Sequence, residues 1–84
     1  LTDSKNASIT YFDKRLAAFL LEMSAIEDSN TLATTHDQIA KNLGTAREVV
    51  SRMLKYFESN NLVELNRGVV RIIDTDALYN LSES

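Results

Sequence analysis

Two short helical patterns separated by a glycine lie in the middle of the chain. Each opens with a threonine followed three residues later by an amide or an acid, Thr35 with Gln38 and Thr45 with Glu48. This spacing is typical of a capping box, in which side chain and backbone satisfy each other's unpaired groups at the start of a helix. Gly44, between the two patterns, can adopt the left-handed backbone conformation that ends a helix. The segment is therefore predicted to be a helix-turn-helix.

The helix-turn-helix motif spans residues 35–60. Side chains of its second helix separate into two faces, because successive residues of a helix are rotated by about 100°. One face is polar throughout and carries Arg47, Glu48, Ser51, Arg52, Lys55, Glu58 and Ser59. The opposite face is apolar and carries Ala46, Val49, Val50, Met53, Leu54, Tyr56 and Phe57. Arginine can donate hydrogen bonds to guanine, and glutamate can accept one from the amino group of cytosine. Arginine and serine can also contact phosphate. A solvated surface also carries such residues, but the short first helix and tight turn leave the first turns of the second helix free to enter a DNA major groove.

Two β-rich runs, residues 62–65 and 69–73, follow the second helix. The turn between them contains Arg67 and Gly68, and glycine adopts a positive φ at the lowest cost. A hairpin at this place, over residues 62–73, is predicted to form the wing of a winged helix. Arg67 at its tip is either an ordinary turn residue or a contact to a DNA phosphate.

The segment before the helix-turn-helix is predicted to be a scaffold. Residues 1–9 are polar and aperiodic, which indicates a flexible lead-in. A helix is predicted from Tyr11, with apolar residues on one face at helical spacing, namely Phe12, Leu16, Phe19, Leu20 and Met23. The polar residues 27–30 end this helix, and residues 31–34 are predicted to form a short strand.

A short closing helix over residues 74–81, opened by Asp74 or Thr75, completes the predicted fold. The fold class is mainly α with a small β-hairpin, a winged helix-turn-helix made of a three-helix core, a wing and the closing helix. No internal repeat or low-complexity tract interrupts the chain, so residues 1–84 are predicted to be a single DNA-binding domain.

The distribution of charge is more informative than the net charge of -3. Residues 41–71 contain six basic and three acidic side chains, a local net charge of +3, whereas residues 1–40 and 72–84 each sum to -3. The basic part coincides with the predicted helix-turn-helix and wing. Within about one Debye length the chain can therefore offer a positive strip to DNA while its other surfaces stay acidic.

The composition argues against a membrane protein, a disulfide-stabilised fold and a thiolate metal site. Apolar residues make up 44% of the 84 residues without forming a long apolar run, and the chain has no cysteine. Such a chain is typical of one small soluble domain that is stabilised by packing. It carries no basic-then-apolar leader, so a cytoplasmic location is predicted. A first residue other than methionine, Leu1, suggests a piece of a longer protein.

No residue pattern points to catalysis. The lone histidine, His36, stands next to Asp37, but neighbours on a helix point apart, and no nucleophile or second histidine accompanies them. A glycine-rich phosphate loop and metal-ligand spacing are also missing from the sequence. An enzyme is therefore the least supported class, and neither a cofactor nor a metal is expected in this segment.

Two binding functions fit the residues: sequence-specific recognition of DNA and a winged-helix protein interaction module, since one fold supports both. An interaction module would carry apolar anchors on the outward face of the second helix. That face has none. DNA binding is therefore favoured.

The run from Thr35 to Lys55 resembles the DNA-binding signature of the Crp/Fnr transcription regulators, the cyclic-AMP receptor protein family. The likeness continues through residues 57–63 into Arg67 and Gly68, and so covers about half of the chain. The resemblance implies base-reading positions at Arg47, Glu48 and Arg52, with Ser51 at a fourth such position. It also implies contacts to the DNA backbone by Thr35, His36 and Gln38. Lys55 and Arg67 are further candidates for backbone contacts.

The resemblance also implies what surrounds such a segment. Full members of the family have an N-terminal effector-sensing β-roll and a long dimerisation helix, neither of which these 84 residues could supply. The expected function is that of the output domain of an effector-responsive bacterial regulator, whose dimeric parent binds an inverted repeat in double-stranded DNA. Some members also touch RNA polymerase, which is a further candidate partner.

Overall fold

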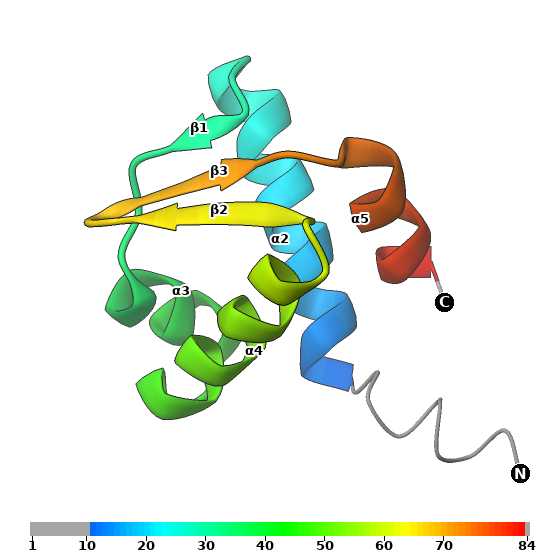
Figure 1. Cartoon of the computed structure of the whole chain (residues 1–84). Helices are drawn as coiled ribbons and strands as arrows, with labels where there is room; N and C mark the ends of the chain where they lie inside the picture. The colour runs from blue at the N-terminus through cyan, green and yellow to red at the C-terminus, as the bar shows by residue number, and fades with distance from the viewer. Residues whose placement is uncertain (1–10, 84) are drawn as a thin grey trace, which may run out of the picture.

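The structure, a computed structural model, describes residues 11–83 (Figure 1). The predicted lead-in over residues 1–9 lies outside this range. The described chain is mainly helical with a small antiparallel sheet, as predicted. Its elements, in chain order, are α2 (Tyr11–Glu27), β1 (Thr31–Leu32), α3 (His36–Leu43), α4 (Arg47–Ser59), β2 (Val63–Asn66), β3 (Val69–Ile72) and α5 (Thr75–Glu83).

The predicted hairpin is present as β2 and β3, and its turn is one residue shorter than expected. Asn66 lies opposite Val69 in the register, which leaves only Arg67 and Gly68 between the strands. Gly68 has a φ of 69°, the left-handed conformation for which the sequence predicted a glycine. The tip of the hairpin points to the side of the molecule where α3 lies (Figure 1).

A third strand, β1, extends the hairpin to a sheet with the order β1-β3-β2. Leu32 lies opposite Val70, so β3 is the central strand and pairs antiparallel on both sides. The strand has two residues, where the sequence predicted four over residues 31–34. It ends early because the Thr34 N–H turns back to the Leu32 carbonyl, 3.0 Å away, and leaves the ladder.

The hydrophobic core draws on every described helix and strand, so these elements share one contiguous cluster of buried side chains. Its largest fully buried side chains are Phe57, Leu16, Leu20, Leu32, Ile39, Leu54, Leu78, Val50, Val63 and Val70. The apolar face predicted for α2 is confirmed, because Leu16 and Leu20 are fully buried and Phe12, Phe19 and Met23 pack against the core. The closing helix α5 packs along α2, with Leu78 as its buried residue.

Two residues of the predicted apolar face of α4 are exposed, Ala46 at the N-cap and Tyr56. Tyr56 is 37% exposed, whereas the adjacent Phe57 is fully buried. Tyr56 lies one turn after the exposed Arg52, so it stands at the edge of the apolar face. The prediction that Tyr56 belongs to the core is therefore wrong. Val49, at the same edge, is half-buried and packs against the core.

Helix ends follow local chemistry. Helix α2 ends at Glu27, and the next residue, Asp28, has a φ of 52°, so the break predicted over residues 27–30 is confirmed. Of the two candidates for opening the closing helix, Asp74 is the cap, because its Oδ1 accepts from the Ala77 N–H at 3.0 Å. Asn61 has a φ of 60° and turns the chain from α4 into β2. Within residues 11–83, none of the helices is long and apolar enough to cross a bilayer.

Candidate nucleic-acid interface

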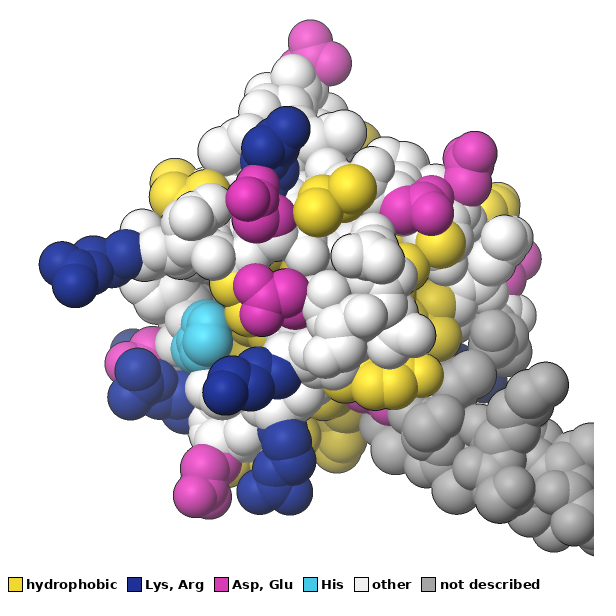
Figure 2. All heavy atoms as spheres, in the orientation of Figure 1, with side chains coloured by type: hydrophobic (Ala, Val, Ile, Leu, Met, Phe, Trp, Pro, Cys, Tyr) yellow, Lys and Arg dark blue, Asp and Glu magenta, His cyan; other side chains and the backbone are white. Residues whose placement is uncertain are grey.

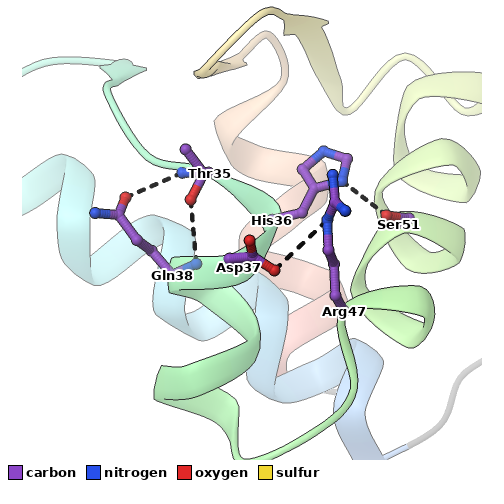
Figure 3. Close-up of polar contacts among 6 residues, drawn as sticks. All are labelled: Thr35, His36, Asp37, Gln38, Arg47 and Ser51. Carbon is purple, nitrogen blue, oxygen red and sulfur yellow. Dashed lines mark hydrogen bonds and ion pairs between the residues drawn. The ribbon is translucent and has the colours of Figure 1, made fainter.

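The first helix of the motif, α3, opens with the predicted capping box. Thr35 Oγ1 accepts from the Gln38 N–H at 3.2 Å, and Gln38 Oε1 accepts from the Thr35 N–H at 3.1 Å (Figure 3). The Thr34 hydroxyl also donates to Gln38 Oε1, at 3.3 Å. The side-chain oxygen of Gln38 thus accepts hydrogen bonds within the cap. The side chain is exposed, and its amide nitrogen is the group that could donate to a ligand.

Gly44 ends α3 in the predicted left-handed conformation, with a φ of 70°. Its N–H donates to the Ala40 carbonyl, and the Thr45 N–H donates to the same carbonyl at 3.0 Å. From α2, the guanidinium of Arg15 donates to the carbonyl of Leu43 at 3.3 Å, so the scaffold helix satisfies another carbonyl at this same end of α3. This turn sets the angle at which α4 leaves.

The second predicted capping box is wrong. The N-cap of α4 is Ala46, in extended conformation, and a methyl group cannot accept a hydrogen bond. The reason lies in the turn, because the Thr45 N–H closes α3 and α4 begins one residue later than the box requires. Glu48 therefore stands at the second helical position and not at the third. It is exposed in the first turn, where a carboxylate is favoured by the helix dipole.

The outward face of α4 carries the predicted base-reading residues. Arg47, Glu48 and Arg52 are exposed, and Ser51 is half-buried. Lys55, one turn further, is also exposed and lies behind them on the same face. These side chains lie on the side of the helix that faces away from the core, because the buried residues of α4 are Val50, Met53, Leu54 and Phe57.

A groove of about 480 Å³ lies where α3, the start of α4 and the hairpin meet. Thr35 and His36 line it from α3, Arg47 lines it from α4, and Arg67 and Gly68 line it from the hairpin tip. The fold thus brings together candidate DNA-contacting residues from three separate segments of the sequence. Lysine and arginine side chains gather on this side of the molecule around the histidine (Figure 2).

Two side-chain contacts join the first turn of α3 to the first turns of α4 (Figure 3). His36 Nδ1 lies 2.8 Å from Ser51 Oγ, and Arg47 Nε lies 3.6 Å from Asp37 Oδ1. His36 and Asp37 engage different partners, in agreement with the expectation that they point apart. Sequence reasoning missed Asp37 as a site residue, and no periodicity could have found either contact, because the partners belong to different helices.

The wing carries two arginines with different surroundings. Arg67 is exposed at the tip and lines the groove. Arg71 lies opposite Glu64 in the strand register, and the two side chains form an ion pair of 2.9 Å. The net charge of +3 over residues 41–71 already counts both partners, so the pair leaves that charge unchanged and places Arg71 beside an acid of the same hairpin.

Within the part of the chain that the structure describes, no three histidine or acidic side chains gather closely enough to hold a metal ion. Beside the aliphatic side chains of Leu65, Val69 and Val70, the groove is lined by guanidinium, imidazole, hydroxyl and amide groups. These are the groups that proteins use to contact DNA phosphates and bases. The fold and this surface together define a winged helix-turn-helix domain.

Comparison with known proteins assigns the family. Residues 14–81 match the profile of the Crp-like helix-turn-helix domain. The chain belongs to the Crp/Fnr family of transcription regulators.

Two curated relatives illustrate the similarity. The transcriptional regulatory protein btr of Bordetella pertussis is 37% identical over 76 residues, which cover 82% of this chain and 31% of btr. The transcriptional activator protein FnrA of Stutzerimonas stutzeri is 34% identical over 77 residues, which cover 83% of this chain and 32% of FnrA. The chain thus spans about a third of the length of these relatives.

Solved structures agree with the fold. A Crp/Fnr-family protein from Eubacterium rectale superposes with a TM-score of 0.84 at 50% identity, over 86% of this chain and 33% of that one. A Crp/Fnr-family transcriptional regulator from Thermus thermophilus superposes with a TM-score of 0.83 at 26% identity, over 95% of this chain and 44% of that one. The winged helix-turn-helix predicted from the sequence is confirmed.

Proposed function

We propose that this chain is the output domain of an effector-responsive bacterial transcription regulator and binds double-stranded DNA sequence-specifically with α4 in the major groove. The observation that carries the proposal is the outward face of α4. Its first turns expose Arg47, Glu48 and Arg52 side by side, next to a groove shared with α3 and the wing. A helix presented in this way can enter a major groove without unfolding its neighbours.

Each base-reading candidate has a chemical role. Arg47 and Arg52 donate to guanine O6 and N7, and Glu48 accepts from the cytosine amino group. The loss of the capping box favours this role for Glu48, because no cap at Ala46 competes for its carboxylate. Ser51, held by His36, is the fourth reader and adds a single hydroxyl to the set.

The backbone contacts would come from both sides of α4. On one side, Thr35, His36 and Gln38 sit at the start of α3, where the helix dipole favours a phosphate. On the other side, the wing tip offers Arg67, and Lys55 follows along α4. Phosphate contacts of this kind fix the position of the recognition helix and carry no sequence information themselves.

The parent protein would bind an inverted repeat as a dimer in the cytoplasm, with RNA polymerase as a further candidate partner. A single recognition helix reads one half-site, and two-fold symmetric DNA sites match two such helices about one turn apart. The comparison proteins are longer than this chain, which leaves room for a sensing and dimerising part.

The alternative function, a protein interaction module, has less support. The exposed large apolar side chains of the described residues are Ile26, Tyr56, Ile73 and Tyr79. Three of them lie outside α4, and Tyr56 stands at the edge of its apolar face. The exposed first turns of α4 therefore offer charge in place of apolar anchors, which suits a nucleic acid better than a protein groove.

Selection from a random double-stranded DNA pool tests the proposal. Two linked copies of the wild-type chain should enrich an inverted repeat of a short motif, and linked copies that carry Arg47→Ala and Arg52→Ala should not. Glu58→Ala, an exposed change at the far end of the same helix, is the matched control and should enrich the wild-type motif. Failure of the wild type to enrich any sequence would refute the proposal.

A further inference from the structure

The contact between His36 and Ser51 connects two kinds of DNA-facing residue. His36 lines the groove from α3, and Ser51 lies on the outward face of α4. Both are half-buried, and His36 Nδ1 lies 2.8 Å from Ser51 Oγ, which is a short hydrogen bond between side chains (Figure 3). This hydrogen bond therefore restricts the rotation of the Ser51 hydroxyl group.

A serine hydroxyl has one proton to donate, and the imidazole decides where it goes. If Nδ1 carries no proton, it accepts from Ser51, and the serine presents only oxygen lone pairs to a ligand. If Nδ1 carries a proton, as it does in the charged ring, it donates to Ser51. The serine proton is then available to an acceptor outside the protein.

We propose that His36 is a specificity-determining positioning residue that sets the direction in which Ser51 hydrogen-bonds to a base. This inference rests on the proposed function. With a neutral ring protonated at its outer nitrogen, Ser51 is an acceptor and selects an amino group, adenine N6 or cytosine N4. With a charged ring, Ser51 is a donor and selects guanine N7 or O6, or thymine O4.

Charged groups from three elements lie around His36. Arg47 from α4 and Arg67 from the wing line the same groove, and Asp37 follows on α3, where it is paired with Arg47. A phosphate that enters the groove can pair with both guanidinium groups and with a charged imidazole. Histidine changes its charge between about pH 5 and 8, so the switch falls in an accessible range.

The test compares DNA selection at about pH 8 and about pH 5.5 for the wild type, Ser51→Ala and His36→Phe. Ser51→Ala identifies the base position that Ser51 reads, because preference is lost there. At that position the wild-type preference should move by about fivefold between the two pH values, the size of one hydrogen bond. His36→Phe keeps a planar ring without nitrogen, so its preference should not change with pH.

Two further measurements distinguish a change in the protonation of His36 from a structural change caused by its substitution. The ¹⁵N shifts of the His36 ring in the DNA complex report the protonation of Nδ1 directly and should change between the two pH values. His36→Gln, which keeps a polar side chain that does not titrate, should show no pH dependence and replaces His36→Phe if that variant unfolds.

The outcomes separate this inference from the proposed function. If the wild type enriches no motif at either pH, the proposed function fails and this inference with it. If a motif is enriched but the Ser51-dependent position is insensitive to pH, or shifts equally in the His36 variants, only this inference is overturned. A motif that is unchanged in Ser51→Ala also overturns it.

Discussion

Asp37 on α3 forms an ion pair with Arg47 at the start of α4, with 3.6 Å between the carboxylate Oδ1 and the guanidinium Nε. The two side chains are 70% and 67% exposed, so solvent screens the pair and its contribution to stability is small. Its effect is on the candidate interface, because it places a carboxylate beside a predicted base-reading arginine and offsets the charge of that arginine. Under the proposed function, Arg47 would have to share or release Asp37 to contact a base.

We expect Asp37→Asn to strengthen binding to DNA of any sequence, because it removes a negative charge beside the groove and leaves Arg47 unpaired. The free energy of unfolding should change by less than about 0.5 kcal/mol. Titrations on non-specific DNA at several salt concentrations measure the effect. Asp76→Asn on α5 is the control, since its carboxylate lies on a different element. Weaker or unchanged binding by Asp37→Asn would contradict this role.

Alanine at Arg47, Glu48 or Arg52 should each cost about 1 to 3 kcal/mol of binding and relax preference at one or two base pairs. The reason is that each side chain makes its own contacts to base edges. Selection of preferred sequences by each single variant measures this, with Glu58→Ala as control. Unchanged preference in all three variants would remove α4 as the recognition helix.

Arg67→Ala should weaken all DNA sites about equally and lower the magnitude of the salt slope by roughly one unit, because one phosphate contact is lost. Base preference should stay the same. Arg71→Ala is a matched control on the same hairpin, since Arg71 is paired with Glu64. Equal slopes for Arg67→Ala and the wild type would show that Arg67 is only a turn residue.

Phe57→Ala should lower the free energy of unfolding by about 3 to 5 kcal/mol through lost burial and a cavity. Its ring is fully buried in one core with Leu16, Leu20 and Leu54. Tyr56→Ala is the neighbouring control and should cost much less, because its ring is 37% exposed. Chemical denaturation measures both, and a loss below about 1 kcal/mol for Phe57→Ala would contradict its place in the core.

The chain alone should be mainly monomeric and bind a single half-site weakly, whereas two linked copies should gain affinity on an inverted repeat. The gain arises from effective concentration and requires a linker that spans half-sites roughly 34 Å apart. Binding to a single half-site and to an inverted repeat, by the chain and by linked copies, is the measurement. Tight binding of the monomer to one half-site, with no gain in affinity from a second half-site, would contradict the prediction that two copies are needed.

Much of the fold follows from local chemistry and is therefore predictable from the sequence. The capping box at Thr35, the left-handed turns at Gly44 and Gly68, and the cap at Asp74 depend on backbone sterics and on hydrogen bonds spanning a few residues. The apolar faces of α2 and α4 follow from helical periodicity. These features identified the helix-turn-helix and the wing before the family comparison.

Two predictions made from the local sequence were wrong, because contacts with other parts of the fold determine the start of α4 and the burial of its residues. The motif at Thr45 fits a capping box, but the Thr45 N–H is taken by the carbonyl of Ala40 and α4 begins later. Tyr56 fits the apolar face, yet it stands at its edge, because the packing of α4 decides which part of that face is covered. Both errors are small shifts along or around a helix.

By itself, the sequence determined where the helices and the hairpin lie and which side chains point outward from α4. Only the tertiary structure decided which of those side chains meet. The pairs His36 with Ser51 and Asp37 with Arg47 depend on the angle between α3 and α4, and the groove depends on how the wing folds back beside them. The reason is physical: backbone preferences act over one or two turns, whereas contacts between elements depend on how the whole core packs.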